Sequence, residues 1–71
     1  MTTAEQVRTL LAALAEVPGD DEAALALDSL TLVQLVEAVE DHFGIRVAPL
    51  DVVPARFGSI GAIARYVESR R

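Results

Sequence analysis

The stretch LALDSLTLVQLVEAVEDHFGI, residues 25–45, contains signals for both the start and the end of one helix. Asp28 and Ser29 are both good N-cap residues, because a short side-chain oxygen can accept hydrogen bonds from the free amides of a first turn. Gly44 suits the left-handed conformation in which many helices end. The stretch therefore predicts a helix that begins at Asp28 or Ser29 and stops at Gly44, its last helical residue being His42 or Phe43.

The predicted helix has two unlike faces when each residue is advanced by about 100°. One face is an apolar stripe that we expect to lie in the core, made of Leu32, Leu35, Val36, Val39 and Phe43. The other is an acidic face with two apolar residues near its start, made of Leu30, Val33, Gln34, Glu37, Glu40 and Asp41. A purely solvated face would not need those two apolar residues, although single exposed apolar side chains are common.

Two further helices are predicted on either side of this one. Apolar residues at helical spacing indicate a first helix from about Ala4 to Glu16, capped by Thr2 or Thr3 and facing the core through Val7, Leu10, Leu11, Leu14 and Val17. Ser59 is expected to cap a last helix, with Tyr66 at the margin of an inner stripe made of Ile60, Ile63, Ala64 and Val67.

The connections are expected to be irregular but partly apolar. Leu25 and Leu27 should fold back onto the bundle. Pro49 and Pro54 are only five residues apart, so no long helix fits between them, and one short turn is expected at 51–53. Phe57 should fill a place in the core. The predicted fold is all-α: a small bundle of three main helices plus a short, irregular third helical segment.

Composition supports one small domain, residues 1–71. Hydrophobic residues make up 52% of the chain and aromatic residues only 4%, so the core must be aliphatic. The single histidine and the lack of cysteine argue against a metal site. No stretch approaches the roughly 18 apolar residues of a membrane span, and the first residues lack a basic signal region, so we expect a cytoplasmic protein that binds no membrane.

The formal net charge of −5 is unevenly distributed. Residues 10–44 contain eight acidic residues and no Lys or Arg, whereas residues 46–71 contain five arginines and two acidic residues. Such a negative centre repels phosphate backbones, which argues against nucleic-acid binding, and it attracts basic protein surfaces. Acidic residues that merely keep the domain soluble are an equally good explanation of the charge taken alone.

The residues do not assemble into an active site, so we do not expect an enzyme. Asp28, Ser29 and His42 contain the groups of a nucleophilic triad, but His42 lies thirteen residues beyond Ser29, nearly 20 Å along the same helix at about 1.5 Å per residue. Glu37, Glu40 and Asp41 lack the additional oxygen ligands of a cation site. Ser29 taken alone is best explained as an N-cap.

The segment 25–45 as a whole closely resembles the acyl carrier protein pattern Leu-Gly-x-Asp-Ser-Leu, which is followed by an acidic helix ending in Glu-x-x-Phe-Gly-Ile. The tail from Phe57-Gly58-Ser59-Ile60 to Tyr66-Val67 is similar to the last helix of that family. The resemblance covers nearly the whole chain. It departs from the family pattern at three positions, where Ala26 replaces the glycine, Thr31 an acidic residue and Gln34 a frequent glutamate.

This resemblance implies a discrete acyl carrier, a monomer, that transports acyl intermediates in polyketide or related secondary-metabolite biosynthesis, such as that of antibiotics. Ser29 would be the attachment point of 4′-phosphopantetheine, and Asp28 would help the phosphopantetheinyl transferase to dock. Other partners would be an acyltransferase, a ketosynthase or an acyl or aminoacyl ligase with a basic docking patch. The carrier residues that dock such enzymes would be Asp28, Leu30, Val33, Gln34, Glu37, Glu40 and Asp41.

Two alternatives remain open at the level of sequence. The stretch Pro54-Ala55-Arg56-Phe57-Gly58-Ser59 is similar to a Pro-x-x-Phe-x-Ser variant found in some carriers of secondary metabolism, which keeps an aminoacyl or peptidyl carrier as an alternative. An unmodified helical interaction module with the carrier fold is the other.

Overall fold

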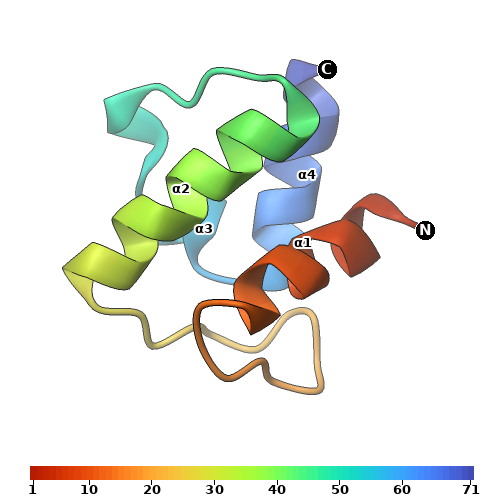
Figure 1. Ribbon diagram of the computed structural model, residues 1–71, viewed down its shortest axis with the longest axis vertical. Coiled ribbons are helices and arrows are strands. Elements are labelled where there is room, and N and C mark those ends of the chain that lie inside the picture. Colours follow the sequence, from red (N-terminus) through yellow and green to blue (C-terminus); the bar gives the residue numbers. More distant parts are fainter.

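The protein is built from helices and connecting loops, without a β-strand (Figure 1). The computed structural model describes all residues, 1–71. The elements in chain order are α1 (Thr3–Ala12), α2 (Ser29–Phe43), a 3-10 turn η1 (Pro49–Asp51), α3 (Pro54–Phe57) and α4 (Ile60–Arg70). The structure confirms the prediction of an all-α bundle with three main helices and a short third helical segment.

Helix α2 begins and ends as its sequence predicts. Asp28 is the N-cap, and Gly44 ends the helix with φ 66°, donating its N–H to the carbonyl of Glu40. Of the predicted core stripe, Leu35 and Val39 are completely inaccessible to solvent. The other stripe residues are only half-buried against the core, namely Leu32, Val36 and Phe43.

Helix α1 starts at its predicted cap but ends four residues early. Thr2 and Glu5 form a capping box, which satisfies two amides of the first turn. The helix stops at Ala12 instead of Glu16. Arg8 gives the reason, because its guanidinium donates to the carbonyl of Pro18 at 2.5 Å and pairs with Asp21, drawing the following loop back toward the helix. The early end leaves Leu14 and Val17, like Leu10 within the helix, half-buried against the core.

Helix α4 supplies four of the ten residues of the core cluster, and one of its residues, Tyr66, was mispredicted. Ile60, Ile63, Ala64 and Val67 are buried as predicted, and Ser59 caps the helix. Tyr66, however, is not at the margin: it is only 3% exposed, and its ring lies 5.5 Å from that of the buried Phe57. Tyr66 can be buried because its hydroxyl donates to Asp51, which lies in a different element that the helical wheel does not take into account.

The connections differ from prediction in detail. The short turn covers Pro49–Asp51 instead of 51–53, and a second helical turn, α3, starts at Pro54. Each begins with a proline, whose fixed φ suits the first position of a helix. Leu25 and Leu27 do fold back, and the N–H of Leu25 donates to the carbonyl of Gly58 at 2.8 Å.

Candidate functional site

Ser29 is the first residue of α2, is exposed, and makes no side-chain hydrogen bond within the protein. The capping role belongs to Asp28, whose Oδ1 accepts from the N–H of Thr31 at 2.8 Å. The carbonyl of Asp28 accepts the next N–H, that of Leu32, at 2.9 Å. Of the two candidate caps, Asp28 is therefore used, and the hydroxyl of Ser29 is free to react.

The electrostatics at this end of α2 suit an anion. The N–H groups of Ser29 and Leu30 lie in the first turn, where no intrahelical acceptor exists, and the helix dipole adds partial positive charge. The carboxylate of Asp28 takes up only the N–H of Thr31, a hydrogen bond that lowers the pKa of Asp28, and it leaves the N–H groups of Ser29 and Leu30 available. A phosphate esterified to Ser29 would lie at such a helix start, which is a common position for phosphates.

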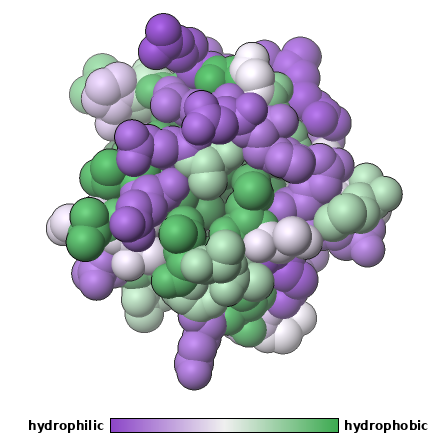
Figure 2. All heavy atoms as spheres, viewed as in Figure 1, coloured by the Kyte–Doolittle hydropathy of each residue, from purple (hydrophilic) through white to green (hydrophobic).

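An apolar groove opens beside Ser29. Its volume is about 420 Å³, and it lies between α2 and the segment that contains η1. The residues that line it are Ser29, Leu32, Val33, Val36, Glu37, Glu40, Val47, Pro49 and Val52. More widely, on the face seen in Figure 1, hydrophobic residues gather over the middle and lower part of the molecule, with hydrophilic residues above and beside them (Figure 2). The groove could shelter the apolar part of a chain attached to Ser29.

A second apolar hollow, of about 240 Å³, lies under the start of α2. Two residues, Leu32 and Val52, line both this hollow and the groove, and they therefore stand between them. The remaining residues around the hollow come from the loop before α2 and from the α3 region: Ala24, Leu25, Leu27, Val53, Pro54, Phe57 and Gly58.

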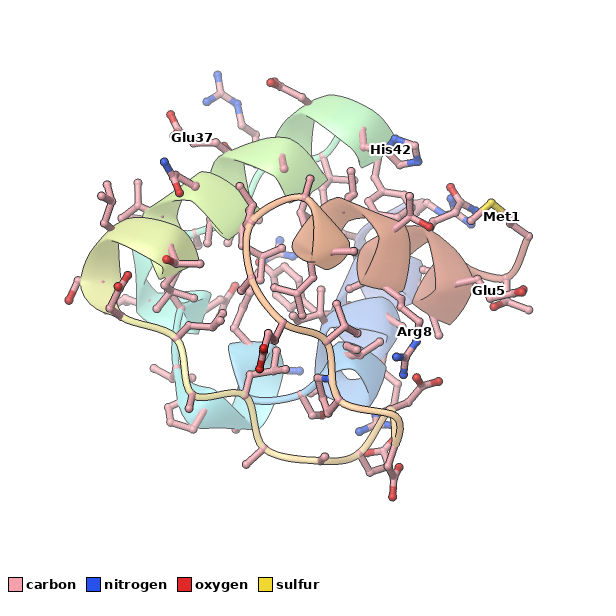
Figure 3. The ribbon with its side chains drawn as sticks, turned by 60° about the horizontal axis from the view of Figure 1, so that its bottom comes forward. Met1, Glu5, Arg8, Glu37 and His42 are labelled. Carbon is pink, nitrogen blue, oxygen red and sulfur yellow. The ribbon has the colours of Figure 1, made fainter.

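The residues expected to dock partner enzymes fall into two groups. Most are exposed and have no ion-pair partner, and Leu30 and Val33 are 68% and 55% exposed. Glu37, labelled in Figure 3, extends from α2 into solvent. Glu40 differs, because its Oε2 accepts a hydrogen bond from the N–H of Val47 at 2.9 Å and its side chain is half-buried. Glu40 thus has a structural role in joining α2 to the groove's opposite wall.

Ser29 and His42 lie at opposite ends of α2. His42 lies at the far end of α2, where its Nε2 is 2.9 Å from Oε1 of Gln6 in α1 (Figure 3). No three His, Cys, Asp or Glu side chains come together in an arrangement that could hold a metal ion. None of the helices has the length and apolar character needed to cross a membrane.

Sequence reasoning missed the wall of the groove that faces α2. Val47, Pro49 and Val52 form this wall, and Asp51 ties it to α4 through Tyr66. No periodicity marks which side chains of this proline-containing segment face α2. The spacing of the two prolines was the only usable signal, and it indicates short turns without indicating their orientation.

Comparison with known proteins agrees with this geometry. The family model described as "phosphopantetheine attachment site" matches residues 5–67, nearly the whole chain. No curated protein and no solved structure gives a significant match. Domains of this family carry a covalently attached 4′-phosphopantetheine, which is consistent with the free hydroxyl of Ser29, the exposed helix start and the adjacent groove. The chain thus belongs to the phosphopantetheine attachment site family, and it is a phosphopantetheine carrier domain.

Proposed function

We propose that the chain is a discrete acyl carrier protein whose Ser29 bears the 4′-phosphopantetheine arm. The observation that supports this most directly is the state of Ser29: its hydroxyl is exposed, has no hydrogen bond within the protein and lies at the lip of an apolar groove. Neither of the other two serines combines these properties, because Ser59 caps α4 and Ser69 donates to the carbonyl of Tyr66.

The modification is a phosphoryl-group transfer onto Ser29. The Oγ of Ser29 forms a bond to the phosphorus of coenzyme A that bears the pantetheine, and the phosphoanhydride bond to the nucleotide breaks. Adenosine 3′,5′-bisphosphate leaves, and the hydroxyl proton passes to a base of the transferase. When attached, the arm supplies the thiol that this cysteine-free chain lacks, and an acyl group is carried there as a thioester.

The chain's own residues then hold and present the cargo. The first turn of α2 accommodates the phosphodiester, and the groove between Val33, Val36 and Val52 shelters the apolar part of what the arm carries. The exposed carboxylates Glu37 and Asp41, beside Leu30 and Val33, form the docking face. Acidic steering gives fast association without tight binding, which suits a carrier that visits several enzymes.

We place this carrier in polyketide or related secondary-metabolite biosynthesis. Its partners would be a phosphopantetheinyl transferase and an acyltransferase, ketosynthase or acyl ligase with basic patches. The Asp28-Ser29-Leu30 motif and the acidic α2 support an acyl cargo. An aminoacyl cargo has one observation in its favour, the Pro-x-x-Phe-x-Ser stretch 54–59, whose Phe57 is buried and whose Ser59 caps α4.

Intact-protein mass spectrometry tests the attachment. The unmodified chain is incubated with coenzyme A, magnesium and a broad-specificity phosphopantetheinyl transferase. Wild type and Ser69→Ala should each gain the mass of one phosphopantetheine, Ser29→Ala should gain none, and fragmentation should locate the added mass on Ser29. A wild-type chain that gains no mass would favour the unmodified interaction module.

Cargo class is tested with the modified protein. It is offered in parallel to a malonyl-transferring acyltransferase and to amino-acid-activating ligases, and the thioester product is weighed. An acyl carrier should accumulate the malonyl thioester. Aminoacyl product alone would replace the acyl proposal with the aminoacyl one.

A further inference from the structure

The groove wall opposite α2 packs on the core through Val47 and Val52, but the η1 segment between them has few ties to the rest of the protein. In η1 and just after it, backbone hydrogen bonds are local: the N–H groups of Asp51, Val52 and Val53 donate to carbonyls within residues 48–51. No residue of η1 is buried, and Leu50 is 90% exposed. The position of this segment therefore depends on a small number of side-chain contacts.

Two polar contacts connect the wall to the helices on either side. At its start, the N–H of Val47 donates to Glu40 of α2. At its end, a single oxygen of Asp51, Oδ2, accepts from the hydroxyl of Tyr66 at 2.8 Å and from Nη2 of Arg70 at 2.6 Å. The two donors both belong to α4, so Asp51 fixes the wall to a helix that is not part of the groove.

The α4 side of this contact includes one buried side chain, that of Tyr66. Tyr66 is 3% exposed and its ring packs near Phe57. The guanidinium of Arg70 lies 5.1 Å from the centre of the Tyr66 ring, which holds both donors in one arrangement. The side chain of Asp51 is itself only 26% exposed. Asp51 is thus held by two donors of α4, the hydroxyl of the buried Tyr66 and the guanidinium of Arg70, whose side chain is 42% exposed.

The residue after Asp51 is Val52, one of the two residues that separate the groove from the hollow beneath α2. Fixing Asp51 to α4 therefore also fixes Val52 opposite Leu32. If Asp51 were released, Val52 could move away from Leu32, and the two apolar spaces of about 420 and 240 Å³ would join.

We propose that Asp51 is a positioning residue for the carrier's cargo: through Tyr66 and Arg70 it holds Val52 between the groove and the hollow, and so limits how far the acyl chain on the protein's own arm can enter. The inference rests on the proposed attachment of the arm to Ser29. In this proposal Val52 and Leu32 set how much of the acyl chain the groove can shelter, and Asp51 keeps Val52 in place.

Hydrogen exchange of the unmodified protein, followed by NMR, tests the anchor itself. Asp51→Ala should raise the exchange rates of the Val52 and Val53 amides several-fold while leaving that of Val39, in the core of α2, unchanged. Tyr66→Phe should give a smaller increase, since Arg70 remains. Asp51→Asn, which keeps an acceptor for the Tyr66 hydroxyl, should restore part of the protection. Glu68→Ala is the matched control, because Glu68 is an exposed acid of α4 that pairs with Arg71 and Thr3 and lines neither space.

Cleavage of thioesters by hydroxylamine tests the consequence for cargo. Each variant is loaded by the phosphopantetheinyl transferase, which uses octanoyl-coenzyme A or acetyl-coenzyme A and so attaches an arm that already carries the octanoyl or acetyl thioester. Releasing Asp51 should let the octanoyl chain enter further, so Asp51→Ala should slow cleavage of the octanoyl thioester several-fold and leave the acetyl thioester unaffected. Glu68→Ala should match wild type with both.

Three results would overturn the proposal. One is that the amide hydrogen-exchange rates of Val52 and Val53 are the same in Asp51→Ala and Glu68→Ala. Another is that Asp51→Ala raises the exchange rate of the Val39 amide as much as those of Val52 and Val53, which would mean a general loss of stability. The last is an octanoyl-to-acetyl cleavage ratio that Asp51→Ala leaves at the wild-type value. Failure of the proposed function is recognised separately, as a wild-type chain without added phosphopantetheine mass, and it would remove the cargo role of Asp51 while the exchange data still decide whether the anchor exists.

Discussion

The carboxylate of Asp28 accepts the backbone N–H of Thr31 at 2.8 Å, and this one contact leaves the neighbouring serine without a structural task. Two adjacent residues of similar capping ability thereby have different roles. Asp28 begins the helix, and Ser29 presents a hydroxyl from its first turn. The proposed modification of Ser29 would therefore leave the cap of α2 intact.

Stability measurements on both positions follow from this arrangement. Asp28→Ala should lower the melting temperature, because the N–H of Thr31 loses its acceptor. Ser29→Ala should leave the melting temperature nearly unchanged, because no hydrogen bond is lost and alanine is a good helix former. Thermal unfolding followed by circular dichroism gives both values, with Asp28→Ser as the control that keeps a capping oxygen. Equal losses for Asp28→Ala and Ser29→Ala would contradict the assignment of the cap.

The loss in free energy of unfolding when an apolar side chain is replaced by alanine should follow how deeply that side chain is buried. Leu35 is fully buried in α2, so Leu35→Ala should reduce the free energy of unfolding by about 2–5 kcal/mol. Leu50→Ala should change it by no more than about 0.5 kcal/mol, because Leu50 is 90% exposed. Phe43→Ala should fall between the two, since Phe43 is half-buried rather than buried as its sequence position predicted. Urea titrations of the three variants check the order, and a cost for Leu50→Ala as large as that for Leu35→Ala would refute it.

Charge reversal separates docking from solubility. Glu37 is exposed and has no partner, so Glu37→Lys should slow acyl transfer by an enzyme with a basic patch, mainly through association. The difference from wild type should shrink with added salt, because exposed charges are screened over about 8–10 Å at ordinary ionic strength. Steady-state transfer kinetics of the modified proteins across a salt series measure this effect.

The controls for charge reversal come from the structure. Glu68→Lys changes the same charge on α4, away from Ser29, and should have little effect on transfer. Glu40→Lys is unsuitable as a docking probe, because it also removes the acceptor for Val47. If Glu37→Lys and Glu68→Lys transfer at the wild-type rate in low salt, the acidic face serves solubility only.

Acid should weaken the fold partly through Asp51. Hydrogen bonds from Tyr66 and then from Arg70 lower the pKa of Asp51 in the folded protein from its ordinary value of 3.8. A lowered folded pKa means that the contribution of Asp51 to stability is complete above 3.8 and is lost as the pH falls through the lower folded value. Wild type should therefore melt higher than Asp51→Asn at neutral pH, and the gap should close as the solution is acidified below that ordinary value. A gap that stays constant down to the lowest pH at which the protein folds would argue against an ionised Asp51.

The helix ends that depend on interactions within one turn could be predicted from the sequence. The start and end of α2 and the start of α4 were predicted correctly, because Asp28, Gly44 and Ser59 act on amides and carbonyls within one turn. The sequence did not predict that the hydroxyl of Ser29 is free. Asp28 and Ser29 are adjacent and both are good caps, and only the backbone conformation shows which of them is the N-cap.

Features set by contacts between distant residues were mispredicted. Helix α1 ends early because Arg8 draws in the loop at Pro18, and Tyr66 is buried because Asp51 supplies its partner. In both cases an arginine or tyrosine side chain meets an oxygen that the sequence pattern does not associate with it. The wall of the groove was missed for the same reason, since its position depends on α2 and α4 together.

The two chain ends lie on the same side of the protein, away from the start of α2 (Figure 1). Thr3 in α1 meets Glu68 and Arg71 at the end of α4 through side-chain hydrogen bonds. A pulling force applied between the ends would therefore act first on the contacts between the start of α1 and the end of α4. These contacts would break one after another, each at low force. Helix α2 would experience that load last, so the mechanical strain would spread from the end of the molecule opposite to the serine.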